Sequence, residues 1–106
     1  MNDIKFKKKI CIFFIHGFCS GSEDWDKQIE YFKNKYNVIA PTLRGHDGQN
    51  KSDLPMSIEQ ISYDCKKLID EHREKDFIFV GHSMGTRVAI NLCHQFKKRT
   101  LGLILV

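Results

Sequence analysis

The chain has 106 residues, of which 28% are charged and 42% hydrophobic, and its formal net charge is +4. These values are typical of one soluble globular domain and exclude a disordered or collagen-like chain. The basic clusters at residues 7–9 and 97–99 lack interleaved aromatic side chains, so we expect no nucleic-acid partner. Because no apolar run reaches the length of a signal-peptide core or a bilayer span, we expect a cytoplasmic protein without membrane contact.

Apolar runs alternate with amphipathic stretches from residue 10 onward. Continuous apolar runs suit strands that are buried on both faces, whereas apolar residues at i, i+4 and i+7 mark one face of a helix. The predicted strands are residues 10–15, 38–40, 77–80 and 101–106. The predicted helices are one through Trp25, Ile29 and Phe32 after the helix-start residues 20–22, one from Ser57 to His72, and one from Met84 to Phe96.

This alternation predicts the fold class, an α/β protein with a mostly parallel sheet and helices on both faces. Right-handed crossovers place the predicted strands in the order second, first, third, fourth. Ligands of such sheets bind beyond the carboxyl ends of the strands. Two motifs fall at those ends, one directly after residue 15 and the other directly after residue 80.

The four cysteines are widely spaced and form no Cys-x-x-Cys pair. This spacing predicts neither a zinc site nor a redox motif, and it favours free thiols in a reducing compartment. We therefore expect no metal and no cofactor. The cysteines are Cys11, Cys19, Cys65 and Cys93.

The motif Gly81-His82-Ser83-Met84-Gly85 matches the pattern Gly-x-Ser-x-Gly and lies between a predicted strand and a predicted helix. That context is typical of a nucleophile elbow. The turn is so tight that we expect Ser83 to adopt a positive φ, and we expect a side chain at Gly81 or Gly85 to collide with neighbouring backbone. The N–H of Met84 and the helix N-terminus would then lie where an oxyanion forms beside the Ser83 hydroxyl.

A second motif, His16-Gly17-Phe18-Cys19, closes the first predicted strand. An oxyanion loop occupies this position in the same arrangement, and the backbone N–H of Phe18 would pair there with that of Met84. The motif contains a single glycine and not a run of glycines.

Taken together, the two motifs, the helix through Trp25 and the stretch Arg44-Gly45-His46 resemble the α/β-hydrolase superfamily in order and spacing, from about residue 10 to residue 106. The resemblance implies a serine nucleophile at Ser83 and hydrolysis of an ester, thioester or carbon–carbon bond through an acyl-enzyme. It implies that residues 1–106 are the N-terminal part of a single α/β-hydrolase domain. It also implies that His16 braces its loop and carries no proton. The residues with structural roles in the elbow and loop would be His16, Gly17, Gly81, His82 and Gly85.

The superfamily places its catalytic acid and then its catalytic histidine after the nucleophile. Residues 84–106 contain no Asp or Glu, and their only histidine is His94. A helix advances about 1.5 Å per residue, so His94 would lie about 16 Å from Ser83 along the axis, too far to act as the base. We therefore expect a truncated chain, an incomplete sequence or a pseudogene remnant, inactive by itself because serine without a base is a weak nucleophile.

Three functions stay open on this reading. The first is a hydrolase whose remainder lies elsewhere, the second is a non-catalytic hydrolase-like binding module, and the third is a transferase that uses the same acyl-enzyme. An epoxide hydrolase or dehalogenase is disfavoured because those proteins place Asp at the elbow. Phe18, Cys19 and Met84 would line a pocket for a small-molecule acyl or ring substrate, and the apolar strand 101–106 would form a sheet edge that favours self-association.

Overall fold

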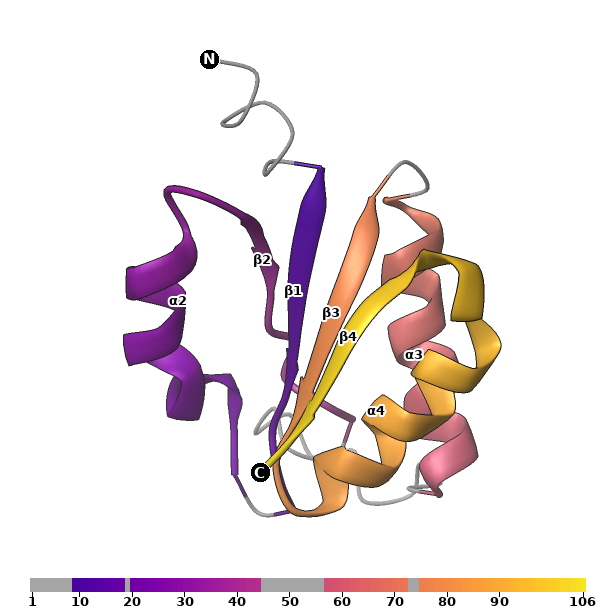
Figure 1. The fold of residues 1–106 in the computed structure, drawn as a ribbon. Coiled ribbons are helices and arrows are strands. Elements are labelled where there is room, and N and C mark those ends of the chain that lie inside the picture. Colours follow the sequence, from indigo (N-terminus) through magenta and orange to yellow (C-terminus); the bar gives the residue numbers. More distant parts are fainter. Residues whose placement is uncertain (1–8, 19, 45–56, 73–74) are drawn as a thin grey trace.

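A computed structural model describes residues 9–18, 20–44, 57–72 and 75–106. These residues form four strands, three α-helices and two short 3-10 helices (Figure 1). The strands are β1 (Ile10–Ile15), β2 (Asn37–Ile39), β3 (Asp76–Gly81) and β4 (Thr100–Leu105). The helices are η1 (Ser22–Trp25), α2 (Asp26–Phe32), α3 (Ile58–Asp70), α4 (Met84–Gln95) and η2 (Lys97–Arg99).

The four strands form one parallel sheet in the order β2-β1-β3-β4, which confirms the predicted order. The central pair is in register along its whole length, from Ile10 opposite Asp76 to Ile15 opposite Gly81. Because both strands end at the same level, the two segments that follow Ile15 and Gly81 emerge side by side. The sheet therefore delivers the two predicted motifs to one edge of the molecule.

Helices α3 and α4 cover one face of the sheet, and α2 covers part of the other (Figure 1). The core under α3 and α4 is aromatic at its centre, where the Phe77 and Phe79 rings stack with their centroids 5.6 Å apart. Phe13 on β1 packs against both rings and is fully buried. Burying an apolar side chain of this size stabilises a fold by about 1.5–3 kcal/mol, so this cluster anchors the central strands.

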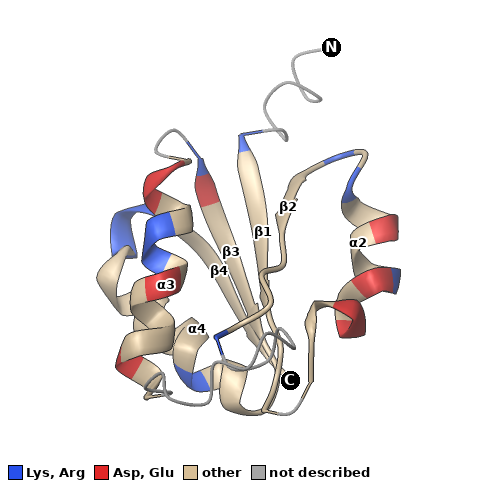
Figure 2. Cartoon of the chain, turned by 180° about the vertical axis from the view of Figure 1, so that it is seen from behind, with Lys and Arg blue, Asp and Glu red and all other residues tan. Residues whose placement is uncertain are grey.

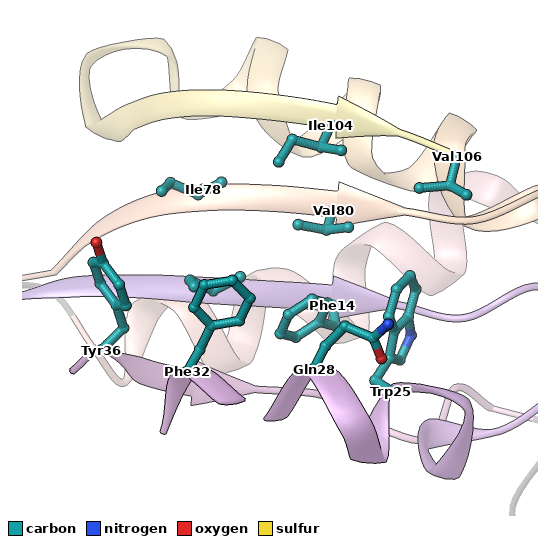
Figure 3. A pocket seen from close by; sticks show the side chains of 10 residues that line it. Phe14, Trp25, Gln28, Phe32, Tyr36, Ile78, Val80, Ile104 and Val106 are labelled. Carbon is teal, nitrogen blue, oxygen red and sulfur yellow. The ribbon is translucent and has the colours of Figure 1, made fainter. Parts of the chain in front are cut away.

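The opposite face is only half covered, because α2 lies over β1 and β2 and leaves the β3 and β4 side open. The open part is a groove of about 420 Å³ that runs between α2 and β4 (Figure 3). Trp25 and Tyr36 lie at its two ends, with Phe14 and Phe32 between them (Figure 3). The remaining lining residues are Ile12, Gln28, Ile78, Val80, Ile104 and Val106.

Both predicted helix starts are found in the structure, and they are capped differently. Ser57 is the N-cap of α3, where its Oγ accepts a hydrogen bond from the Gln60 N–H at 3.1 Å. The helix start predicted at residues 20–22 is confirmed, because η1 begins at Ser22 with Gly21 as its N-cap, although no side chain caps it. The hydroxyl of Ser22 instead accepts a hydrogen bond from Thr42 Oγ1 at 3.1 Å.

Charged residues lie on the helices, at the starts of β1 and β3 and on connecting segments, while the middle of the sheet carries none (Figure 2). Both α2 and α3 carry acidic and basic residues, and two pairs form ion pairs, Glu30 with Lys33 at the end of α2 and Lys66 with Asp70 on α3. No helix within the described ranges combines the length and the apolar character that a membrane crossing requires.

Candidate active site

The elbow motif, residues 81–85, forms the turn from β3 into α4. Ser83 is the N-cap of α4, with φ 55° and ψ −121°, and among the described residues it is the only one other than glycine with a positive φ. Two glycines make this turn possible. A Cβ atom on Gly81 would lie 2.3 Å from the carbonyl oxygen of Gly85, and one on Gly85 would lie 2.3 Å from that of Ile15. A side chain at either position would therefore displace backbone.

The backbone around Ser83 is held by hydrogen bonds on both sides. Its N–H donates to the carbonyl oxygen of Val106 at 3.3 Å, and its carbonyl oxygen accepts from the N–H of Thr86 at 2.9 Å. The Thr86 hydroxyl donates to the same oxygen at 2.7 Å. By contrast, no described residue accepts a hydrogen bond from the N–H of Met84. The first N–H of α4 is thus available to an incoming anion.

The Ser83 side chain is exposed at a cavity of about 380 Å³. Ile58 at the start of α3 and Met84 supply its apolar walls, and Arg87 one turn further along α4 supplies a cation. Met84 lies in the lining, as predicted, but Phe18 does not, and its side chain is 57% exposed. Cys19, the third residue predicted to line the pocket, lies outside the described residues.

The loop after β1 lies directly against the elbow. A Cβ atom on Gly17 would lie 3.0 Å from the Cβ of Ser83 and 3.2 Å from the carbonyl oxygen of His82. The His82 N–H also donates to the carbonyl oxygen of Ile15 at 3.1 Å. The structure therefore brings the two motifs together at the carboxyl ends of β1 and β3.

His16 is fully buried, and its ring links two segments that are far apart in sequence. Its Nε2 accepts a hydrogen bond from the N–H of Leu43 at 3.0 Å, so this nitrogen carries no proton. The proton of the neutral ring then lies on Nδ1, which donates to the carbonyl oxygen of Gly17 at 2.8 Å. The ring thereby ties the loop after β1 to the segment that follows β2.

That segment is anchored in turn by an ion pair that sequence reasoning missed. Arg44 Nε donates to Asp64 Oδ2 at 2.6 Å, and Arg44 Nη2 donates to Asp64 Oδ1 at 2.7 Å. These hydrogen bonds to the carboxylate of Asp64 raise the pKa of Arg44 above its usual value. The sequence signal for this pair was weak: Asp64 is an acidic residue beside the apolar face of the predicted helix 57–72.

A general base for Ser83 is not found within the described ranges. No hydrogen bond to the Ser83 hydroxyl is recorded there, and no carboxylate there pairs with a histidine. His72, two residues beyond the end of α3, bonds the carbonyl oxygen of Leu68, and His94 lies exposed in the last turn of α4. His46 lies outside the described residues.

The two buried thiols of the core are poor nucleophiles. Burial raises the pKa of the Cys11 and Cys65 thiols to about 12, so neither is a thiolate near neutral pH. The described part of the chain contains no cluster of His, Cys, Asp and Glu that could hold a metal ion. Among the described groups, Ser83 is therefore the strongest candidate for the reacting atom.

Comparison with known proteins agrees with this arrangement. The sequence model of the family described as "alpha/beta hydrolase fold" matches residues 11–106. This chain belongs to the alpha/beta hydrolase fold family. The hydrolase-fold chain is 24% identical over 100 residues to the protein ABHD8 of Homo sapiens, across 92% of this chain and 23% of that protein.

Solved structures of the family superpose closely on this alpha/beta hydrolase chain. MenH from S. aureus does so with a TM-score of 0.80 and 30% identity, covering 92% of this chain and 37% of that one. Est816, described as an N-acyl homoserine lactone degrading enzyme, has a TM-score of 0.83 and 27% identity, covering 92% and 38%. The chain spans about a quarter of the length of the curated relatives it matches.

Proposed function

We propose that this chain supplies the nucleophile and the oxyanion hole of a serine hydrolase, which cleaves an ester, thioester or carbon–carbon bond through an acyl-enzyme on Ser83. The observation that carries the proposal is the φ of 55° at Ser83. Such strain costs about 1–3 kcal/mol and persists only where the surrounding structure enforces it. Here Gly81 and Gly85 allow the close packing that enforces it. A strained, exposed hydroxyl after a central strand is the arrangement of a nucleophile elbow.

In the proposed reaction, Ser83 Oγ attacks the carbonyl carbon of the substrate while a base takes the hydroxyl proton. The carbonyl oxygen becomes an oxyanion and accepts hydrogen bonds from the N–H groups of Met84 and Phe18. The leaving group departs with a proton, and water then hydrolyses the acyl-enzyme. The N–H of Met84 supports this assignment because it has no acceptor among the described residues and lies at the positive end of α4.

We further propose that the catalytic histidine and its carboxylate lie outside the described residues. Removing a triad member leaves only the effect of the oxyanion hole and of substrate binding, so residues 1–106 alone would hydrolyse esters slowly at best. The relatives are consistent with this proposal, because the match covers only about a quarter of their length and the rest of each relative lies outside it.

The cavity beside Ser83 favours a small-molecule substrate with an apolar acyl or ring group. Ile58 and Met84 would contact the apolar part, and both come from the amino ends of helices. The guanidinium of Arg87 would face the polar end of the substrate. A series of p-nitrophenyl esters with increasing acyl length measures this preference.

The deciding experiment is fluorophosphonate labelling of the protein encoded by the complete reading frame, followed by mass mapping of the modified peptide. We expect the label on Ser83 and no label in Ser83→Ala. Ser62→Ala is the matched control, because the buried Ser62 Oγ has no hydrogen-bond partner among the described residues. This control should be labelled at the wild-type rate.

The second candidate is a non-catalytic, hydrolase-like binding module. It is favoured by one observation, the absence of a histidine–carboxylate pair at Ser83 within the described ranges. A folded protein from the complete reading frame that neither reacts with fluorophosphonate nor hydrolyses any ester would establish this alternative. A labelled Ser83 with transfer to an alcohol in place of water would instead indicate a transferase.

A further inference from the structure

We infer that Asp64 of α3 is a positioning residue for the oxyanion hole, acting through Arg44, Leu43 and His16. The inference rests on the proposed function, since it assigns the N–H of Phe18 to the oxyanion. Three links join α3 to the loop after β1. They are the ion pair of Asp64 with Arg44, the hydrogen bond from Leu43 N–H to His16 Nε2, and the hydrogen bond from His16 Nδ1 to the Gly17 carbonyl oxygen.

The last link determines where the N–H of Phe18 points. The carbonyl group of Gly17 and the N–H of Phe18 belong to the same peptide unit, which is planar and trans. In a trans peptide the C=O and N–H bonds point in opposite directions. Fixing the Gly17 oxygen on the His16 ring therefore fixes the direction of the Phe18 N–H. The N–H of Ser20 donates to the same oxygen at 3.1 Å and holds the plane from a second side.

The middle link keeps the ring in the tautomer that this geometry needs. Because Leu43 N–H can only donate, Nε2 must accept, and the proton of the neutral ring stays on Nδ1. Loss of the Leu43 contact would free the buried ring to take the other tautomer. Nδ1 would then be an acceptor facing the Gly17 oxygen, and this oxygen would keep only the hydrogen bond from the Ser20 N–H.

The first link holds the backbone of Leu43 in place. The Leu43 side chain is buried in the core together with Ile61 and Cys65 of α3. Arg44, the next residue along the chain, donates hydrogen bonds from two nitrogens to Asp64 of α3. The backbone between these two anchors has little freedom, so the Leu43 N–H stays directed at the ring. An ion pair of this bidentate kind adds geometric specificity to its attraction.

The test compares Asp64→Asn with Asp70→Asn in the protein from the complete reading frame. Asp70 is the matched control because it lies on the same helix and pairs with Lys66 at 2.8 Å, on an exposed face away from the loop. We expect Asp64→Asn to lower kcat about 10-fold with little change in KM, since the loss of a whole oxyanion donor costs about 100- to 1000-fold. Asp70→Asn should leave both constants unchanged.

A double-mutant cycle separates positioning from general destabilisation. His16→Asn keeps a donor close to the Nδ1 position and removes the contact with Leu43, so it uncouples α3 from the loop. In this background Asp64→Asn should have no further effect on kcat. If Asp64→Asn lowers kcat as much in the His16→Asn background as in the wild type, Asp64 acts by another route and the inference is overturned.

A readout without catalysis distinguishes failure of this inference from failure of the proposed function. In the Ser83→Ala protein from the same reading frame, we expect Asp64→Asn to shift the backbone amide signals of Leu43 and Phe18, and Asp70→Asn to shift neither. Amide signals that do not move would refute the positioning role. If these amide signals shift in a protein that never reacts at Ser83, the connection from Asp64 to the loop after β1 is supported and the hydrolase proposal is rejected.

Discussion

Gly85 of α4 packs so closely on Ile15 of β1 that a Cβ atom would lie 2.3 Å from the Ile15 carbonyl oxygen. This contact holds the amino end of α4 on the end of β1. Gly85→Ala should therefore lower the free energy of unfolding by about 3 kcal/mol, as overpacking against backbone does. Urea unfolding measures the loss. Gly102→Ala is the control, because its Cβ would meet only Ile78 side-chain atoms at 3.7 Å or more. A change of about 0.5 kcal/mol or less is expected there, and equal losses would contradict the packing argument.

Gly17→Ala tests the apposition of the two motifs. Its Cβ would lie 3.0 Å from the Cβ of Ser83, a distance that a small shift of the loop relieves. We expect the rate of fluorophosphonate labelling at Ser83 to fall about 10-fold or more, because a 1 Å misplacement near a reacting group has effects of this order. The urea midpoint should change much less than in Gly85→Ala. Wild-type labelling in Gly17→Ala would show that this loop does not form part of the site.

The strands, the helices and the strand order were predictable because each depends on local periodicity or on the handedness of crossovers. The position of Ser83 followed from its place between a strand and a helix. The contacts of Leu43 and Arg44 were not predictable, since they join residues 27 and 20 positions apart. Such pairs depend on how the segment after β2 packs in the folded chain, which local sequence does not determine. The helix start at residues 20–22 was predictable, but the hydrogen bond from the Thr42 hydroxyl to the Ser22 hydroxyl was not, for the same reason.

Alkaline pH should destabilise the fold through its buried thiols. Burial raises the pKa of Cys11 and Cys65 from 9.0 to about 12. Between these values the unfolded chain loses thiol protons that the folded chain retains, so the free energy of unfolding falls as pH rises from about 9 and levels off near 12. Urea midpoints measured from pH 8 to pH 11 should decline, and less steeply in Cys65→Ala.

Residues 1–106 expressed alone should self-associate through β4. This strand is an edge of the sheet, and its apolar side chains are exposed, with Ile104 at 51%. Unpaired strand edges with apolar faces favour pairing with another chain. Ile104→Lys should therefore shift the species seen by light scattering towards monomer. Ile90→Lys, on α4 at a similar 48% exposure, should not. A monomeric wild-type chain at high concentration would contradict this prediction.

The half-covered face of the sheet also gives the molecule a built-in optical signal. Trp25 is the only tryptophan of the chain, it is 8% exposed, and it stands at one end of the groove in Figure 3. Its indole N–H is buried and has no hydrogen-bond partner among the described residues. Indole emission responds to the polarity of its surroundings and to hydrogen bonding. Any segment, second copy or small molecule that fills the groove therefore changes the emission of a single fluorophore, and titration by fluorescence reads occupancy without a label.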